Sequence, residues 1–144
     1  MLFMTQLYMK FIELVDKLSP VMLFIIRLWM AHVFFASGLV KIDDFENTVA
    51  LFRDEYKTPF LPPEIAAYIG TSFELACPVL LTFGLATRLA TLPLLAMTAV
   101  IQFTYLEHTD HIYWAILLGT ILTVGAGKIS LDYLIAKKFR KITS

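Results

Sequence analysis

Charge and cysteine are scarce in this sequence. Only 17% of its 144 residues are charged, where a soluble domain has about 25%. Cys77 is the one cysteine, which excludes an internal disulfide and a CxxC redox centre within the chain. Twelve basic residues balance twelve acidic ones, and neither a basic helix nor a glycine-rich phosphate loop is evident. Nucleic acid is therefore not an expected partner.

Apolar residues are abundant instead. They make up 58% of the chain, too large a share for a soluble domain of this size, so we predict an all-α, polytopic membrane protein in contact with the lipid bilayer. A helix needs about 20 residues to cross a bilayer, and four apolar runs meet this length. They predict a single domain, residues 1–144, built as a four-helix transmembrane bundle with spans at about 20–40, 64–83, 86–106 and 112–131.

Proline and glycine place the ends of these spans. Ser19 and Pro20 fit an N-cap followed by a proline at the first helical position, which would begin the first span there. Pro62 and Pro63 open the second span in the same way. Gly84 separates the second span from the third, because glycine commonly ends a helix.

The basic residues outside the spans predict the orientation. With both termini in the cytoplasm, eight of them lie on that side and three on the other, which agrees with the positive-inside rule. We therefore expect a multi-pass protein with both termini cytoplasmic. The eight are Lys10, Lys17, Arg88, Lys128, Lys137, Lys138, Arg140 and Lys141, and the three are Lys41, Arg53 and Lys57.

Two further segments have amphipathic helical spacing and are expected to lie on the membrane surface. The first carries charges between its apolar positions, unlike the apolar core of a signal peptide. We predict an N-terminal interfacial amphipathic helix there, and a periplasmic cap helix in the loop after the first span. The apolar positions are Leu7, Phe11, Leu14 and Leu18 in the first segment, and Phe45, Val49, Phe52 and Tyr56 in the second.

Small residues repeat along one face of three spans, and such faces usually pack against other helices in a membrane. These faces are expected to point into the bundle, and two of them also carry charged residues. The faces are Arg27, Ala31, Gly38 and Lys41 in the first span, Ala66, Gly70, Glu74 and Pro78 in the second, and Ala115, Gly119, Thr123 and Gly127 in the fourth.

An arginine and a glutamate thus share the predicted interior. A lone charge at membrane depth is costly, so we predict that Arg27 and Glu74 form a buried ion pair. Two roles stay open for this pair: it either fixes the register of the helices or contacts a ligand or a proton path.

Other polar residues extend the candidate intramembrane cluster. His32 lies about 140° around its helix from Arg27; it either joins the cluster or donates to a backbone carbonyl. Gln102 is a second hydrogen-bonding candidate, near the outer end of the third span. His108 and His111 are only weak candidates for a metal site, because a solvated loop is the simpler interpretation of residues 107–111. No metal site and no intrinsic cofactor are predicted.

Two motifs resemble the DoxX family of small bacterial inner-membrane proteins. The first is Arg-x3-small-x2-Phe-x3-Gly-x2-Lys, and the second is Glu-x9-Gly-x3-Arg in the run ELACPVLLTFGLATR. The resemblance covers roughly residues 20–130, and position 31, where glycine is more usual, holds alanine. The matching residues are Arg27, Ala31, Phe34, Gly38, Lys41, Glu74, Gly84 and Arg88.

The resemblance implies a membrane subunit associated with thiosulfate:quinone oxidoreductase or with another redox complex. On this hypothesis a quinone enters the bundle interior, with Glu74 as the acid, Arg27 as the stabilising cation and His32 as a hydrogen-bonding ring. No flavin, haem or iron–sulfur motif is present, so electrons would come from a protein partner.

The alternative is a non-catalytic membrane scaffold or assembly factor. Its polar cluster would only specify the bundle, and its cap helix would bind another protein. With either function, we expect a protein partner or a homo-oligomer in the membrane. A transporter is less favoured, because no internal repeat or broken helix pair is evident.

Overall fold

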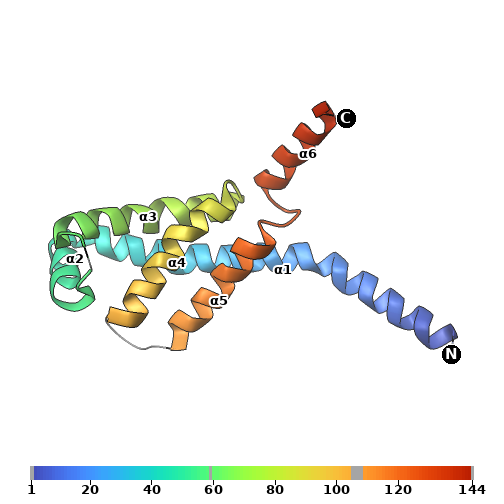
Figure 1. Ribbon diagram of the computed structural model, residues 1–144, viewed down its shortest axis with the longest axis horizontal. Coiled ribbons are helices and arrows are strands. Elements are labelled where there is room, and N and C mark those ends of the chain that lie inside the picture. Colours follow the sequence, from blue (N-terminus) through green and yellow to red (C-terminus); the bar gives the residue numbers. More distant parts are fainter. Residues whose placement is uncertain (1, 59, 105–108, 144) are drawn as a thin grey trace.

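The computed structural model describes residues 2–58, 60–104 and 109–143, and over these residues the protein is all-helical, without a strand. These residues form six α-helices and one π-helical segment, which follows the second α-helix, and the arrangement of the helices can be followed in Figure 1. The elements are α1 (Leu2–Asp43), α2 (Phe45–Leu51), η1 (Phe52–Tyr56), α3 (Pro63–Phe83), α4 (Thr87–Thr104), α5 (Thr109–Val124) and α6 (Leu131–Thr143).

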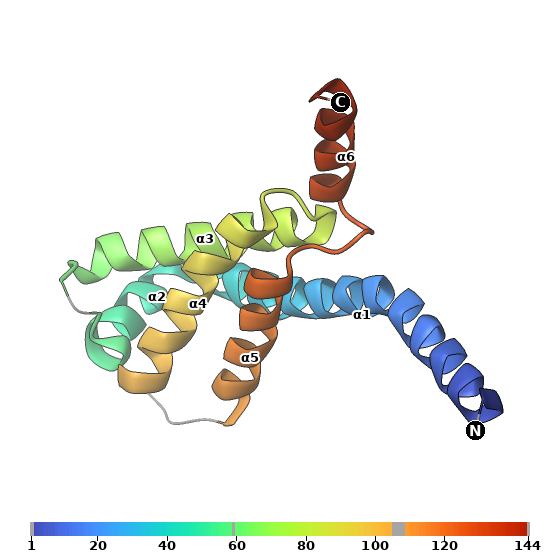
Figure 2. The ribbon, with the colours of Figure 1, turned by 45° about the vertical axis from the view of Figure 1, so that its right-hand side comes forward.

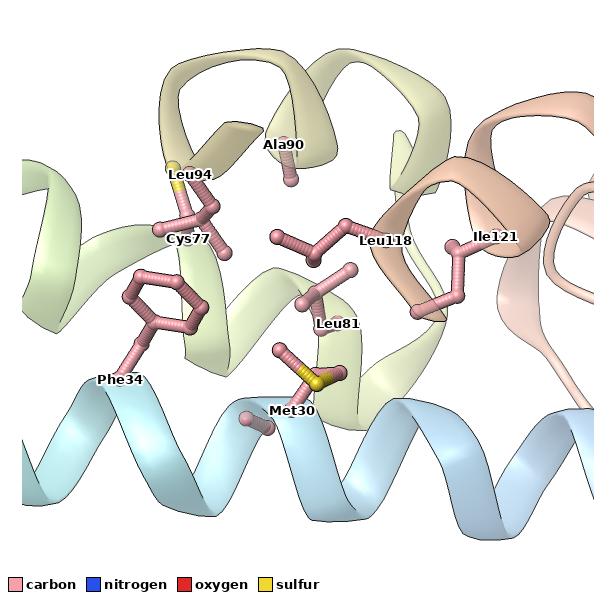
Figure 3. Packing of buried hydrophobic residues seen from close by; sticks show 9 residues of the cluster. Met30, Phe34, Cys77, Leu81, Ala90, Leu94, Leu118 and Ile121 are labelled. Carbon is pink, nitrogen blue, oxygen red and sulfur yellow. The ribbon is translucent and has the colours of Figure 1, made fainter. Parts of the chain in front are cut away.

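Four helices form the body of the protein. The second half of α1 lies beside α3, and α4 and α5 form a second layer across them (Figure 1). Their shared core is apolar, and in Figure 3 the side chains of Met30, Leu81 and Leu118 point toward one another from α1, α3 and α5. The other buried members are Ala31, Phe34, Cys77, Ala90, Leu94 and Ile121.

Within the described residues, three helices are long and apolar enough to cross a bilayer: α1, α3 and α4. The chain is therefore an integral membrane protein, as the composition predicts. The predicted spans 64–83 and 86–106 correspond to α3 and α4, although residues 105–108 lie outside the described part. These helices place a large apolar surface in contact with lipid.

The predicted fourth span, 112–131, is too long. Its helix, α5, has 16 residues and ends at Val124, so it is about 24 Å long. Gly125 and Gly127 follow with φ angles of +97° and +78°, and this left-handed backbone ends the helix.

The predicted start of a helix at Pro20 is wrong. α1 is one helix of 42 residues with Pro20 inside it, so the segment predicted to be interfacial and the predicted first span form one continuous helix. A proline removes one backbone N–H and bends a helix without always breaking it. Figure 2 shows that the N-terminal part of α1 bends away from the bundle.

The loop after α1 does contain a helical segment, as the spacing of its apolar residues predicts. The Asp44 carboxylate caps α2 by accepting from the backbone N–H of Asn47 at 3.1 Å. Phe52 of η1 is buried against Ala66 and Ala67 of α3, with Phe45, Val49 and Tyr56 at the edge of this cluster. α2 and η1 therefore cover the first turns of α3.

α6 was not expected, and the prediction that the chain has no basic helix is wrong. It is amphipathic, and its basic residues, Lys137, Lys138, Arg140 and Lys141, gather in its second half. At 13 residues it is too short to cross a membrane. Figures 1 and 2 both show it projecting from the body of the protein.

The small residues of α5 do not face the interior, contrary to the prediction. A Cβ at Gly119 would have no neighbour within 4 Å, and Thr123 is exposed. The buried positions of α5 are Leu118 and Ile121. Because α5 is short and contacts mainly α4, large side chains fill its interface in place of close backbone contact.

Replacing Leu118 with alanine should destabilise the protein by about 2 kcal/mol, at the lower end of the range for buried leucines. Because lipid is as apolar as the protein core, the loss of stability comes from lost packing contacts and not from a transfer of apolar surface from water. Ile116→Ala, on the same helix but 59% exposed, is the control and should change stability much less. Equal losses for the two variants in a detergent unfolding titration would contradict this core assignment.

Candidate functional site: the Lys41–Glu74 pair

The most deeply buried ion pair of the described residues joins α1 to α3. Lys41 Nζ lies 2.6 Å from Glu74 Oε1 and 2.7 Å from Oε2. It also donates to Ser37 Oγ at 2.9 Å, one helical turn away. Lys41 and Glu74 are 7% and 1% exposed. The three donors of the ammonium group therefore all have acceptors, and the carboxylate charge is balanced.

The predicted Arg27–Glu74 pair does not form. Arg27 is fully buried, but its Nη1 donates to Leu81 O at 3.2 Å and its Nη2 to Ile129 O. Glu74 pairs instead with Lys41, which follows the predicted first span, 20–40, directly.

The register of α1 and α3 explains this difference. Gly38 of α1 faces Glu74 of α3 closely. A Cβ atom added at Gly38 would lie 3.1 Å from the backbone carbonyl carbon of Glu74 and 3.1 Å from its Cβ. Arg27 lies about 16 Å from this crossing, toward the N-terminus of α1, at a rise of about 1.5 Å per residue. It therefore reaches the C-terminal end of α3. The Lys41 side chain leans back toward the N-terminus of its helix, as helical side chains do, and so meets Glu74.

The offset arises because α2 and η1 occupy the space beside the first turns of α3. Phe52 lies against Gly70, where its ring would be 3.0 Å from an added Cβ. α3 consequently extends past the end of α1 instead of starting level with it. An Arg27–Glu74 pair would require the two helices to end level, and the offset gives Glu74 a different partner.

Two cavities share the Lys41–Glu74 pair as part of their walls. The first, which we call the apolar cavity, measures about 210 Å³ and lies between α3, α4 and η1. The second, the polar cavity, measures about 290 Å³ and lies between α1, α4 and α5. The apolar cavity is lined by Phe52, Gly70, Phe73, Pro93, Met97 and Val100 among others, and the polar cavity by Ser37, Thr98, Asp110, His111 and Trp114.

His111 and Gln102 form the rim of this region. The Nδ1 atom of His111 lies 3.1 Å from Gln102 Oε1, and the His111 ring stacks edge-on against Trp114 with centroids 5.1 Å apart. Gln102 is half-buried. The pair joins the ends of α4 and α5 beside the polar cavity.

His32 lies apart from this region. It is exposed, and its ring centroid lies 6.3 Å from that of Trp29 on the outer side of α1. The other candidate, His108, lies outside the described residues. No group of three or more metal-ligating side chains occurs in the part of the chain that the structure describes.

Arg27 belongs to a second polar network, at the opposite end of the bundle. Its guanidinium group occupies the space beside Gly84, where an added Cβ would lie 1.9 Å from Nη1. It ties the end of α3 to the loop before α6 and also lies over the Phe24 ring, 5.5 Å from the centroid. These contacts are with backbone carbonyls and a neighbouring ring, so the network fastens helix ends together.

Arg88 and Asp132 complete this network. Arg88 Nη2 donates to Thr123 O at 3.1 Å and so caps the end of α5. The Asp132 carboxylate accepts from the backbone N–H groups of Ala86 and Thr87, at 2.7 and 2.9 Å, and so caps the start of α4. An acidic side chain is favoured at a helix N-terminus.

Ser37 and Asp132 were not predicted as members of the two polar networks. Ser37 lies one turn before Lys41, a spacing that allows the two side chains to meet, and this signal was available. Asp132 lies far along the chain from the helix that it caps, and no local pattern indicates that contact.

A sequence model of the DoxX family matches residues 22–107, more than half of the chain. The chain belongs to the DoxX family. This DoxX protein is also 34% identical over 135 residues to a Haemophilus influenzae protein described as "Uncharacterized protein", covering 84% of this chain and 87% of that one. No solved structure matches it.

The motif residues of this DoxX protein divide between the two polar networks. Gly38, Lys41 and Glu74 form the buried pair and the close helix contact beside it. Arg27, Gly84 and Arg88 fasten the ends of α3, α5 and the loop before α6, while Phe34 belongs to the apolar core. The first network lies in the walls of both the apolar and the polar cavity.

Proposed function

We propose that this DoxX protein is the membrane subunit of a quinone-associated redox complex, and that the quinone head group binds beside Lys41 and Glu74. The observation that carries the proposal is the position of this buried pair in the wall of both cavities. We further propose a multi-pass topology in a bacterial inner membrane, with α5 as the fourth crossing, both termini cytoplasmic and α2 and η1 as the periplasmic cap.

The lining of the two cavities suits an amphipathic ligand. Phe73 and Ile69, which line the apolar cavity, are 41% and 39% exposed. A long apolar tail could leave through this side into the lipid. The head group would lie toward Lys41, Ser37 and Thr98, which supply the polar atoms. An apolar pocket with a few converging polar groups is typical of small-molecule sites.

The buried pair supplies a donor and a carboxylate at one point. All three Lys41 donors are engaged with Glu74 and Ser37, so a ligand carbonyl would replace the Ser37 contact and leave the ion pair intact. A nearby acid and a cation are the groups that proton-coupled reduction of a carbonyl uses. The quinone would supply the redox chemistry, and the electrons would come from a partner subunit.

The proposal predicts that loss of the pair removes bound quinone while the fold persists. Lys41→Met combined with Glu74→Met removes both charges together, so neither is left buried and uncompensated. Protein extracted in mild detergent should then retain at least tenfold less quinone than wild type, measured by solvent extraction and mass spectrometry. Arg53→Met with Glu64→Met is the control, because this second ion pair is exposed and neither of its residues lines the apolar or the polar cavity.

Wild-type protein without quinone, or a double variant that retains the wild-type amount, would overturn the proposal. A bare chain or homo-oligomer from the same extraction would favour the second candidate function, a membrane scaffold. The observation that favours a scaffold is the Arg27 network, in which every charged group fastens helix ends.

A further inference from the structure

The polar cavity joins the buried Lys41–Glu74 pair to one end of the bundle. Glu74 lies in its wall, and so does Asp110 in the first turn of α5, which is exposed. His111, next to Asp110, also lines the cavity and is half-buried. Tyr56 of η1 lines it too, so this end is the one that carries the cap formed by α2 and η1. The cavity therefore leads from the buried pair to the protein surface on the cap side.

The size and the lining of the polar cavity suit water. Its volume of about 290 Å³ is enough for several water molecules, because one water occupies about 30 Å³ in the liquid. Each buried water needs two to four polar partners. Each carboxylate oxygen of Glu74 has two lone pairs, so it can accept from a water while it accepts from Lys41. The other polar side chains in the wall include Ser37, Thr98, Asp110 and His111.

The other side of the pair is closed by the apolar core. Along α1, the fully buried Met30 lies between the pair and the Arg27 network, and along α3 the fully buried Leu81 does the same. Both pack with Leu118 of α5 (Figure 3). Close-packed apolar side chains offer no hydrogen-bonding group to a water or a proton. Among the described residues, the polar route to Glu74 therefore leads from the cap side.

We propose that the polar cavity is a water-filled inlet through which Glu74 exchanges protons with the side of the membrane that the cap faces, the periplasm in the proposed topology. Water in the inlet carries protons between the surface and the carboxylate. Asp110 and His111, where the cavity meets the surface, exchange these protons with bulk water, because both side chains can gain and lose a proton.

This inference rests on the proposed quinone site, and it names the source of the protons for that site. Reduction of a quinone to its quinol takes two electrons and two protons and forms two O–H bonds. The electrons come from the partner subunit. Glu74 takes up one proton from the inlet, passes it to the quinone oxygen beside it and returns to its ionised state beside Lys41. Water in the inlet gives the second proton to the other oxygen and regains it from the cap side.

The first test asks whether a reagent dissolved in water reaches the inlet, and it needs no quinone. Thr98→Cys places a thiol in the inlet wall, and Thr91→Cys is the matched control. Both threonines are buried on α4, and each hydroxyl donates to the backbone carbonyl one turn earlier. Of the two, only Thr98 lines the polar cavity. Cys77→Ser removes the native thiol, and Glu55→Cys, at an exposed position of η1, marks the cap side.

A small, membrane-impermeant methanethiosulfonate reagent is added to sealed vesicles of either orientation. Thr98→Cys should react from the same side as Glu55→Cys and about tenfold faster than Thr91→Cys, because a thiol in apolar packing stays protonated and inert. Ser37→Cys lies in the wall formed by α1 and should react from the same side, which keeps the test decisive if Thr98→Cys folds poorly. Inlet thiols that react no faster than Thr91→Cys, or only from the other side, would overturn the proposal.

The second test follows the protons in proteoliposomes whose orientation is measured by labelling of Glu55→Cys. Reduction of the bound quinone through an electrode-driven mediator should consume protons on the cap side, as reported by an impermeant pH dye confined there. Proton uptake on the other side would contradict the assigned route. Protein that binds no quinone would overturn the proposed function and this use of the inlet together, while the thiol labelling still decides whether water enters the cavity.

Discussion

Gly84→Ala is expected to destabilise this protein by about 3–5 kcal/mol, a large part of the total stability of a typical domain. Gly84 has a φ angle of +67°, which strains any residue with a Cβ. The new methyl group would also lie 1.9 Å from Arg27 Nη1 and 2.5 Å from the Cβ of Ser130. Arg27 would have to leave its contacts with Leu81 O and Ile129 O, which leaves a charge buried without partners.

Gly119→Ala is the matched control for this variant. It makes the same chemical change inside α5, where an added Cβ meets nothing within 4 Å. Alanine is favoured over glycine within a helix by about 0.5–1 kcal/mol, so this variant should be as stable as wild type or slightly more stable. Tryptophan fluorescence during unfolding with increasing SDS measures both, and a Gly84→Ala protein of wild-type stability would contradict the assigned role of Arg27.

The second large effect is expected from separating Lys41 and Glu74. Lys41→Met alone or Glu74→Met alone leaves one charge buried without its partner and should destabilise the protein by about 3–5 kcal/mol. The double variant should recover most of this loss, because two unbranched apolar side chains fill the space without a charge. The double-mutant cycle should therefore give a large coupling energy.

A double-mutant cycle at Arg53 and Glu64 tests whether burial causes the large coupling energy expected for Lys41 and Glu74. Their side chains are 55% and 59% exposed, and water screens such pairs, so little coupling is expected. A similar small coupling at Lys41 and Glu74 would show that the two charges act independently. A double variant that is stable and still binds quinone would show that the pair has only a structural role.

The two predictions distinguish the two polar networks by their effects on folding and on quinone binding. Damage at Gly84 should reduce folding, and quinone binding should fall only with the amount of folded protein. The Lys41–Glu74 double variant should fold and lose quinone. This difference is measurable in the same preparations, by normalising bound quinone to folded protein.

Much of the fold could be predicted from the sequence because apolar length and helix boundaries are local signals. Pro62 and Pro63 at the start of α3, and Gly84 at its end, lie where the pattern placed them. The inward face of α3 was also predictable, since its small residues follow helical spacing and Ala66, Gly70, Glu74 and Pro78 are all buried. Local signals failed at Pro20, where tertiary context decides whether a proline ends a helix or bends it.

By itself, the sequence determined that this is a helical membrane protein of the DoxX family, with charges on the inner faces of α1 and α3. Only the tertiary structure decided which charges meet. Helical spacing fixes the face on which a residue lies, but it does not fix how far one helix slides along another. That offset follows from the packing of α2 and η1 beside α3, and it pairs Glu74 with Lys41 and places Arg27 beside Gly84.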